Sequence, residues 1–257
     1  MTTMIRPDGR HPHAMRPTAI EPGFMPYAEG SALISMGNTR VICTATASAS
    51  VPDHAKNSGK GWITAEYAML PRSSPYRVSR ERHGPGGRSQ EIQRLIGRSL
   101  RAVADMALME GVAITVDCDV LQADGGTRCA SITGGFVALA LAVHRLQAEG
   151  RLPGGVLRDH LAAISLGIYR GTVVLDLPYA EDSVADTDMN LVMTGAGHLV
   201  EVQATAEGAP FTVAQHAELL ELGARAVGDL VAMQRTVLEA AGAALRPAEP
   251  APLPLMP

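Results

Sequence analysis

The chain has few cysteines, no cluster of histidines and no close cysteine pair. Its 257 residues include Cys43, Cys118 and Cys129, an odd number without CxxC spacing, in apolar or Gly-flanked contexts. This pattern argues against a disulfide framework and favours buried free thiols. The eight histidines are scattered, and only His11 and His13 lie close together, in a Pro-flanked segment typical of a loop. We therefore expect no histidine metal site.

The sequence also lacks an apolar run of the length that spans a membrane, about 18 residues or more. Its first residues, 1–16, are rich in Pro, His and Arg, which is not typical of a signal peptide. With 46% hydrophobic residues the chain can still bury a substantial core. We expect a cytoplasmic protein without a membrane partner.

Positive charge is not in excess overall, but it is locally concentrated. A formal net charge of −4 excludes a general polycation, so any nucleic-acid binding must depend on a local basic patch. Such a patch, opposed only by Glu81 and Glu91, consists of Arg72, Arg77, Arg80, Arg82, Arg88, Arg94, Arg98 and Arg101. Residues 71–87 are expected to form a long loop, and such loops in compact domains are usually functional or disordered. The alternative is an arginine-rich face that is merely solvated.

The hydrophobic pattern favours an α+β fold with helices layered on sheets. Strand-like runs at 32–36 and 39–47 flank a Gly-Asn pair typical of a β-hairpin. An amphipathic helix is expected over 90–110, a strand over 112–121 and a deeply buried helix over 131–148. After the Gly- and Pro-rich residues 150–155, two further hairpins and a long helix capped by Thr212 and Gln215 repeat this order. We therefore predict a duplicated unit, with halves over 1–150 and 156–245, and a disordered Pro-rich tail over 246–257.

A glycine turn between the strand at 112–121 and the following helix is suited to an anion. Its sequence is Asp-Gly-Gly-Thr-Arg at 124–128. Backbone N–H groups at a helix N-terminus converge on an anion, and the helix dipole adds partial positive charge. Thr127 adds a hydroxyl, and Arg128 adds a planar fork that can hold two phosphate oxygens. The alternative is a plain turn with an exposed arginine.

Carboxylates are crowded between two strand-like segments of the second half. Residues 179–190 contain Glu181, Asp182, Asp186 and Asp188. Carboxylates packed this closely repel one another, and a hard divalent cation such as Mg²⁺ offsets the repulsion. The alternative is an acidic surface loop.

Several uncommon stretches together indicate a family. They are GWITAEY at 61–67, MLPRS at 69–73, EIQRLIGRSLR at 91–101, DCDVLQADGGTR at 117–128, EDSVADTDMN at 181–190 and EVQATAEG at 201–208. With these motifs, in this order, the chain resembles bacterial ribonuclease PH over residues 5–245. The resemblance implies the ribonuclease PH fold, in which a unit similar to domain 2 of ribosomal protein S5 occurs twice, with mixed sheets packed against helices. It also implies a homohexamer built as a trimer of dimers.

The resemblance assigns roles to individual residues. The phosphate-binding residues of the family are matched by Arg88, Gly126, Thr127 and Arg128, and its acidic pair, associated with catalysis and with Mg²⁺, by Asp182 and Asp188. The implied activity is that of a tRNA nucleotidyltransferase. Such an enzyme is a phosphorolytic 3′ to 5′ exoribonuclease, which transfers nucleotides from tRNA precursors and rRNA to inorganic phosphate and reversibly releases nucleoside diphosphates.

Contacts to the RNA itself are expected from the loop and from the helix that follows it, through Arg72, Arg77, Arg80, Arg94 and Arg98. Two other functions are considered. A non-catalytic RNA-binding ring subunit should have lost the arginine and aspartate set, which this chain keeps. A small-molecule kinase needs a longer nucleotide-binding loop than the turn at 124–128. The chain departs from the family at 83–88, which is short and lacks a lysine, and at Cys129, where threonine is common.

Overall fold

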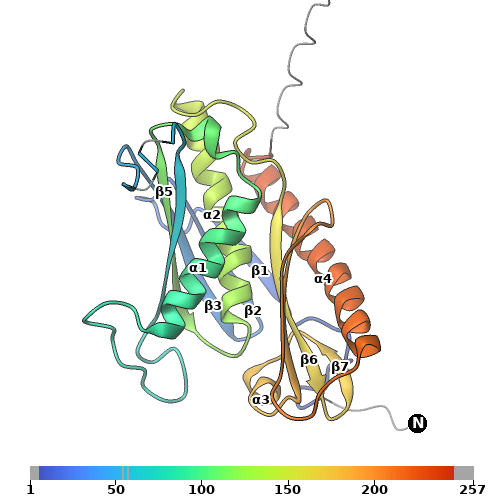
Figure 1. The fold of residues 1–257 in the computed structure, drawn as a ribbon. Helices are drawn as coiled ribbons and strands as arrows, with labels where there is room; N and C mark the ends of the chain where they lie inside the picture. Colours follow the sequence, from blue (N-terminus) through green and yellow to red (C-terminus); the bar gives the residue numbers. More distant parts are fainter. Residues whose placement is uncertain (1–5, 54, 57, 246–257) are drawn as a thin grey trace, which may run out of the picture.

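The computed structural model describes residues 6–53, 55, 56 and 58–245, and the predicted tail lies outside them. Within these residues, a five-stranded sheet and a four-stranded sheet lie side by side with helices between and beside them (Figure 1). The first sheet has the order β1 (Thr18–Pro22), β2 (Gly30–Met36), β3 (Thr39–Ser48), β5 (Ala113–Gln122), β4 (Trp62–Met69). The second has the order β7 (Thr172–Leu175), β6 (Leu161–Tyr169), β8 (Thr187–Thr194), β9 (Leu199–Ala206).

The predicted hairpin of the first half is present. Strands β2 and β3 pair antiparallel up to Met36 and Thr39, and Gly37 turns the chain with a φ of 58°. Only β4 runs parallel to its neighbour, β5, so the first sheet is mixed. The second sheet, in contrast to the mixed sheet expected there, is antiparallel throughout.

One helix joins the two halves into a single core. Helix α2 (Thr127–Ala148) packs against β2 and β3 on one side and against β6 on the other. It is the one helix in the described ranges that is long and apolar enough to cross a membrane, but 83% of its apolar window is buried inside the protein. The predicted free cysteines, Cys43, Cys118 and Cys129, are confirmed as buried thiols in this core.

The remaining helices cover the sheets. Helix α1 (Gly87–Ala102) packs on β4, and α4 (Val213–Ala240) packs on β6. The predicted capping box of α4 is confirmed, because the Thr212 hydroxyl accepts the N–H of Gln215 while the Gln215 side chain accepts the N–H of Thr212.

The predicted extent of three elements was wrong. Helix α1 ends at Ala102 rather than near 110, because Asp105 caps a separate 3-10 turn, η1 (Met106–Met109), through the N–H of Ala107. Helix α2 begins four residues earlier than expected. The acidic segment is not a loop: it comprises a short helix, α3 (Tyr179–Asp182), and the beginning of β8.

Candidate active site

All six residues predicted to bind phosphate or to act in catalysis line one cavity. The cavity, of about 400 Å³, lies where the first half meets the second. The first half contributes Arg88, Gly126, Thr127 and Arg128, and the second contributes Asp182 and Asp188. Residues almost a hundred positions apart in the chain therefore face the same space.

The glycine turn opens directly onto α2. Gly125 and Gly126 have φ values of 76° and 68°, in the left-handed region that favours glycine. A Cβ atom at Gly125 would lie 2.3 Å from the carbonyl oxygen of Leu177, so a larger residue does not fit there. The first N–H groups of α2 have no intrahelical acceptor, and the helix dipole adds positive potential at the same end. The turn thus supplies backbone donors to an anion in the cavity.

The hydroxyl of Thr127 is oriented by a buried tyrosine. Its Oγ1 lies 2.9 Å from Oη of Tyr67, which is 3% exposed. Burial raises the pKa of Tyr67, although the hydrogen bond with Thr127 and the charges of Arg88 and Arg128 oppose this shift. A neutral tyrosine can donate to Thr127, which leaves the hydroxyl hydrogen of Thr127 for a ligand.

The guanidinium of Arg128 is held in place from two sides. Its Nη1 donates to Oε1 of Gln203 on β9 at 2.9 Å and to Oε1 of Glu91 on α1 at 3.4 Å. Both bonds use the same nitrogen, and the other donors of the planar fork remain for a ligand. Arg88, by contrast, is an exposed residue in the first turn of α1.

The two aspartates face the arginines across the cavity. Burial raises the pKa of Asp182, against the lowering effect of Arg128, Arg88 and Arg16. Burial, followed by the charge of Asp182, raises the pKa of Asp188 to about 6, against the lowering effect of Arg128 and Asn190. Ionising both carboxylates here therefore costs free energy, and a cation between them would reduce that free-energy cost.

Comparison with known proteins identifies the family of both halves of the chain. Residues 14–144 match domain 1 of the 3′ exoribonuclease family and residues 159–226 match its domain 2. The chain is 56% identical over 237 residues to a ribonuclease PH from Moorella thermoacetica, covering 91% of this chain and 95% of the relative. It is also 56% identical over 233 residues to one from Roseobacter denitrificans, covering 90% of this chain and 98% of the relative.

The chain belongs to the ribonuclease PH family.

Solved structures show the same fold at low identity. Rice Rrp46 matches with a TM-score of 0.74 and 21% identity, over 91% of this chain and all of that protein. The exosome of Archaeoglobus fulgidus, solved with RNA bound to the active site, matches with a TM-score of 0.73 and 24% identity, over 88% of this chain and 91% of that one. The predicted ribonuclease PH fold is thus confirmed.

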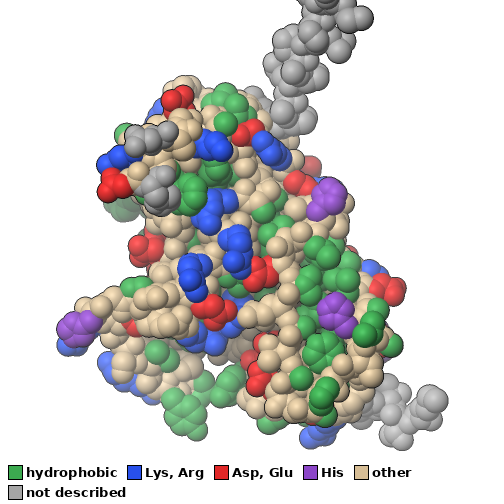
Figure 2. All heavy atoms as spheres, viewed as in Figure 1, with side chains coloured by type: hydrophobic (Ala, Val, Ile, Leu, Met, Phe, Trp, Pro, Cys, Tyr) green, Lys and Arg blue, Asp and Glu red, His purple; other side chains and the backbone are tan. Residues whose placement is uncertain are grey.

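The predicted RNA-binding arginines of this ribonuclease PH family member lie outside the cavity. All five are exposed: Arg72, Arg77, Arg80, Arg94 and Arg98. Lys and Arg side chains are conspicuous along the face that carries α1, and the loop before α1 projects from the body (Figures 1 and 2). Arg80 lines a neighbouring cavity of about 490 Å³ that also includes Arg88, whereas Arg98 forms an ion pair with Glu201. Their role in RNA binding stays a prediction.

Sequence reasoning assigned no role to several residues that line or support the cavity. Ser165 on β6 is 4% exposed and lines it, and its Oγ has no hydrogen-bond partner among the described residues. Asn190 donates from Nδ2 to Oδ2 of Asp188 at 3.4 Å, and its Oδ1 accepts from Cys129 at 3.3 Å. Tyr76 and Tyr179 line the cavity with exposed rings. Asn190 is the last residue of the carboxylate motif at 181–190, so the sequence offered a signal for it. Ser165 occurs in an apolar run without any polar pattern.

Proposed function

We propose that the cavity binds inorganic phosphate and the 3′ end of RNA, and that the protein removes nucleotides from that end by phosphorolysis. One observation carries the proposal: an anion-binding turn and a pair of carboxylates, each predicted separately, face each other across one cavity. A non-catalytic ring subunit has no need for this complete set.

The chemistry requires one anion to approach another. Phosphate is the nucleophile and the last internucleotide phosphate is the target, so the protein must offset their repulsion. The N–H groups of the turn, the Thr127 hydroxyl, and the guanidinium groups of Arg88 and Arg128 hold and neutralise the nucleophile. Catalysis is then mainly positioning and charge stabilisation. The products are a nucleoside diphosphate and an RNA one nucleotide shorter, and the retained anhydride bond makes the reaction reversible.

Mg²⁺ fits the acidic side of the cavity. The described part of the chain has no group of three or more His, Cys, Asp or Glu side chains placed to hold a metal ion. Mg²⁺ is often held by one or two carboxylates together with water and substrate phosphates, so Asp182 and Asp188 are a sufficient protein contribution. Asp182 and Asp188 would hold the cation, which would supply Lewis-acid polarisation of the scissile phosphoryl group.

The RNA has two kinds of surface available outside the phosphate turn. Tyr76 and Tyr179 are 82% and 54% exposed at the cavity, and aromatic rings in such positions stack bases without regard to sequence. The exposed arginines of 72–80 and of α1 contact backbone phosphates farther from the 3′ end. The substrates are tRNA precursors and rRNA, and the active form is a cytoplasmic homohexamer, a trimer of dimers.

A single assay tests the proposed activity. RNA labelled at its 3′ terminal nucleotide is incubated with the protein and Mg²⁺, with and without inorganic phosphate, and the released nucleotides are separated. We expect nucleoside diphosphates with phosphate and almost no release without it. Release of monophosphates in phosphate-free buffer would identify a hydrolase instead. The same assay on a tRNA precursor and on an unstructured oligonucleotide, with the particle mass from light scattering, tests the substrate and the assembly.

A further inference from the structure

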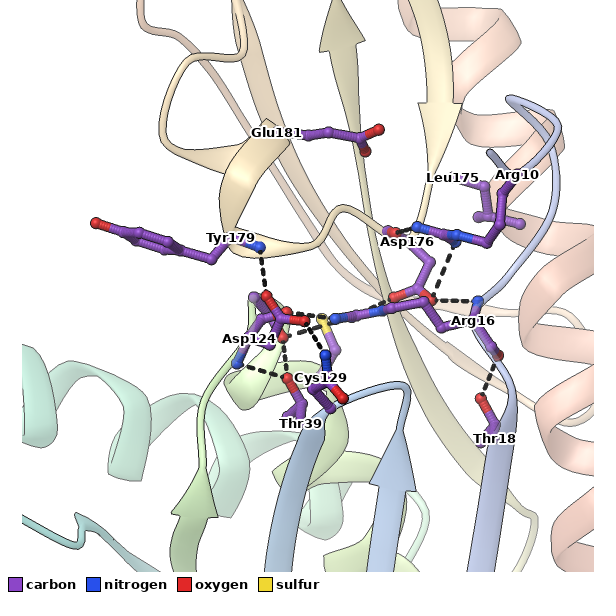
Figure 3. A network of polar contacts seen from close by, with 12 residues as sticks. Arg10, Arg16, Thr18, Thr39, Asp124, Cys129, Leu175, Asp176, Tyr179 and Glu181 are labelled. Carbon is purple, nitrogen blue, oxygen red and sulfur yellow. Dashed lines mark hydrogen bonds and ion pairs between the residues drawn. The ribbon is translucent and has the colours of Figure 1, made fainter. Parts of the chain in front are cut away.

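The segment before β1 crosses from the first half of the protein to the second. Its Arg16 forms a buried ion pair with Asp176, which follows β7 in the second half (Figure 3). Nη2 of Arg16 donates to Oδ1 of Asp176 at 2.6 Å, while its Nε and its backbone N–H donate to Oδ2 at 3.0 and 2.7 Å. The two residues are 5% and 1% exposed. Together these bonds fix Arg16 on the second half.

The same guanidinium contacts the phosphate-binding turn. Its Nη1 donates to the carbonyl oxygen of Asp124, and its Nη2 lies 3.4 Å from the carbonyl oxygen of Gly125 (Figure 3). One buried arginine therefore connects Asp176 of the second half to the turn of the first half. A buried charge with this many bonds is costly to rearrange, which makes the connection stiff.

Arg16 contacts the turn through two backbone carbonyls, and its side chain is not among those that line the candidate active site. Arg16 and Asp124 line a neighbouring cavity, whereas Gly125, Gly126, Thr127 and Arg128 line the active one. In a trans peptide unit the C=O and the N–H point in opposite directions. Carbonyls fixed toward Arg16 therefore turn the N–H groups of the following residues, Gly125 and Gly126, away from Arg16. Arg16 thus contacts the carbonyl side of the two peptide units whose N–H groups are the proposed anion donors.

Thr39 and Tyr179 also form hydrogen bonds with the turn. The Thr39 hydroxyl donates to the carbonyl oxygen of Gly125 at 2.7 Å and accepts the N–H of Asp124 at 2.9 Å. The Asp124 carboxylate accepts the N–H of Tyr179 at 3.2 Å, at the first residue of α3 (Figure 3). Since α3 ends at Asp182, the hydrogen bond from Tyr179 connects the turn to the helix that carries one of the two aspartates.

A second arginine of the same segment fixes α3 from the other end. The guanidinium of Arg6 donates to both carboxylate oxygens of Glu181, at 2.9 and 2.6 Å, and both side chains are 0% exposed. Glu181 immediately precedes Asp182. The segment 6–16 thus contacts both chemical halves of the cavity, the phosphate turn through Arg16 and the acidic helix through Arg6.

We propose that Arg16 is a positioning residue: paired with Asp176, it holds the N–H groups of the phosphate-binding turn at the orientation and distance that phosphorolysis needs from Asp182 and Asp188. This inference rests on the proposed function. Its effect is specific to phosphate, because the guanidinium bonds the turn and not the surfaces offered to RNA.

Arg16→Lys tests this role because it keeps the charge and removes the planar fork. We expect the KM for phosphate to rise about tenfold and kcat to fall, while the KM for a short RNA changes less than twofold. Thr39→Val removes the two hydroxyl bonds of Thr39 to the turn without unpairing a buried charge, and we expect a rise of about threefold in the KM for phosphate. Arg145→Ala, an exposed substitution on α2, is the control and should match the parent.

A binding measurement separates this inference from the proposed activity. The rise in Tm on addition of inorganic phosphate, without RNA, reports the turn even if the parent shows no turnover. We expect this rise to be smaller in Arg16→Lys and Thr39→Val than in the parent. Parental phosphate binding and parental kinetics in Thr39→Val and Arg16→Lys would overturn the inference, as would equal increases in the KM for phosphate and for RNA. If Arg16→Lys does not fold, Thr39→Val decides.

Discussion

The glycine turn at 124–128, proposed to bind phosphate, and the arginine-rich loop at 70–86 both carry donors for anions, yet they are built in opposite ways. The turn is fixed by buried partners: Arg16 and Thr39 hold its carbonyls, and Tyr67 holds its hydroxyl. In the loop at 70–86, the side chains of Arg72, Arg77 and Arg80 are exposed and make no hydrogen bond or ion pair with any described residue. The turn is thus held by buried partners, whereas these three arginines of the loop are held by none of the described residues.

This difference suits the two ligands. Inorganic phosphate is small and must be placed against a reacting bond, where a misplacement of about 1 Å can cost a hundredfold in rate. RNA partners differ in shape, and contacts to their backbone phosphates act largely through charge. Substitutions at the turn and its opposing aspartates should therefore have large effects on chemistry, and substitutions in the loop should have small effects that depend on salt.

The largest loss is expected at the acidic side of the cavity. Asp188→Asn should lower kcat by about 10²- to 10³-fold, because it removes one of two carboxylates that offset charge next to the reacting phosphates. Turnover measured over a range of Mg²⁺ concentrations checks this, with exposed Asp229→Asn on α4 as the control. Recovery of the parental rate at high Mg²⁺ would assign Asp188 to cation affinity alone, and a parental rate at all concentrations would contradict the assignment.

Arg128→Ala should cost about 2 to 3 kcal/mol, a factor of roughly 30 to 150, because a charge-assisted and bidentate contact to phosphate is lost. The loss should occur mainly in the KM for phosphate. Steady-state kinetics with phosphate and RNA varied in turn measure it. Because Arg128 also bonds Gln203 and Glu91, Gln203→Ala is the companion variant: it removes the support and keeps the guanidinium, so its effect should be smaller. An unchanged KM for phosphate in Arg128→Ala would exclude the contact.

Glycine substitutions compare the turn and the loop in stability. Gly125→Ala should lower the free energy of unfolding by about 2 to 4 kcal/mol, because its Cβ meets the Leu177 carbonyl at 2.3 Å and its φ is positive. Gly84→Ala in the loop has a positive φ but open space around it, so about 1 kcal/mol is expected. Chemical denaturation checks both, with Gly154→Ala as the unstrained control. Equal losses at Gly125 and Gly84 would contradict the comparison.

The pH dependence follows from the pKa of Asp188, which burial raises to about 6. The ionised carboxylate is the form that binds a cation, so at limiting Mg²⁺ kcat should fall as the pH drops below this value, and saturating Mg²⁺ should move that fall to lower pH. The pKa of Asp188 in the folded protein lies above its unfolded value of 3.8. The protonated carboxyl therefore contributes stability that is fully present below pH 3.8 and is lost as the pH rises through about 6.

The stability consequence can be measured apart from activity. In buffer with a chelator, the free energy of unfolding of Asp188→Asn relative to that of the parent should increase by about 1 to 2 kcal/mol from pH 4 to pH 8. This is less than the full pKa shift of Asp188 implies, because the cavity is open to water. Denaturation at both pH values gives the difference. A constant difference between the two proteins would show that Asp188 titrates normally.

The smallest effect on the reaction itself is expected in the loop. Simultaneous replacement of Arg72, Arg77 and Arg80 by Ala should raise the KM for a structured tRNA precursor several-fold and leave the KM for phosphate unchanged. Each lost phosphate contact should reduce the salt dependence of RNA binding by about one unit of slope or less. Replacement of Arg145, Arg225 and Arg235 by Ala changes the net charge equally and is the matched control. Parental RNA binding would mean that the loop is only solvated, and an assembly smaller than that of the parent would place its arginines in an interface.

Much of the site could be predicted from sequence because its motifs are local. The turn at 124–128 consists of consecutive residues, with glycines that tolerate positive φ directly before a helix. Its conformation therefore depends on residues that are adjacent in the sequence. The hairpin at Gly37 and the capping box at Thr212 are local in the same way, and both are confirmed. The end of α1 was not predictable from periodicity, because apolar residues continue past Ala102 and the cap at Asp105 interrupts the helix.

The amino-acid sequence by itself therefore determined the fold class, the glycine turn at 124–128 and the pair Asp182 and Asp188, and the turn and the pair each depend on residues that are close in the chain. Only the tertiary structure decided how these parts are joined. Arg16 contacts Asp176 across 160 positions and Asp124 across 108. Ser165, whose hydroxyl has no hydrogen-bond partner among the described residues, lies beside Asp188 and Asn190 only because β6 pairs with β8. Such contacts have no local pattern, because a buried charge requires a partner but the sequence does not specify where in the chain that partner lies.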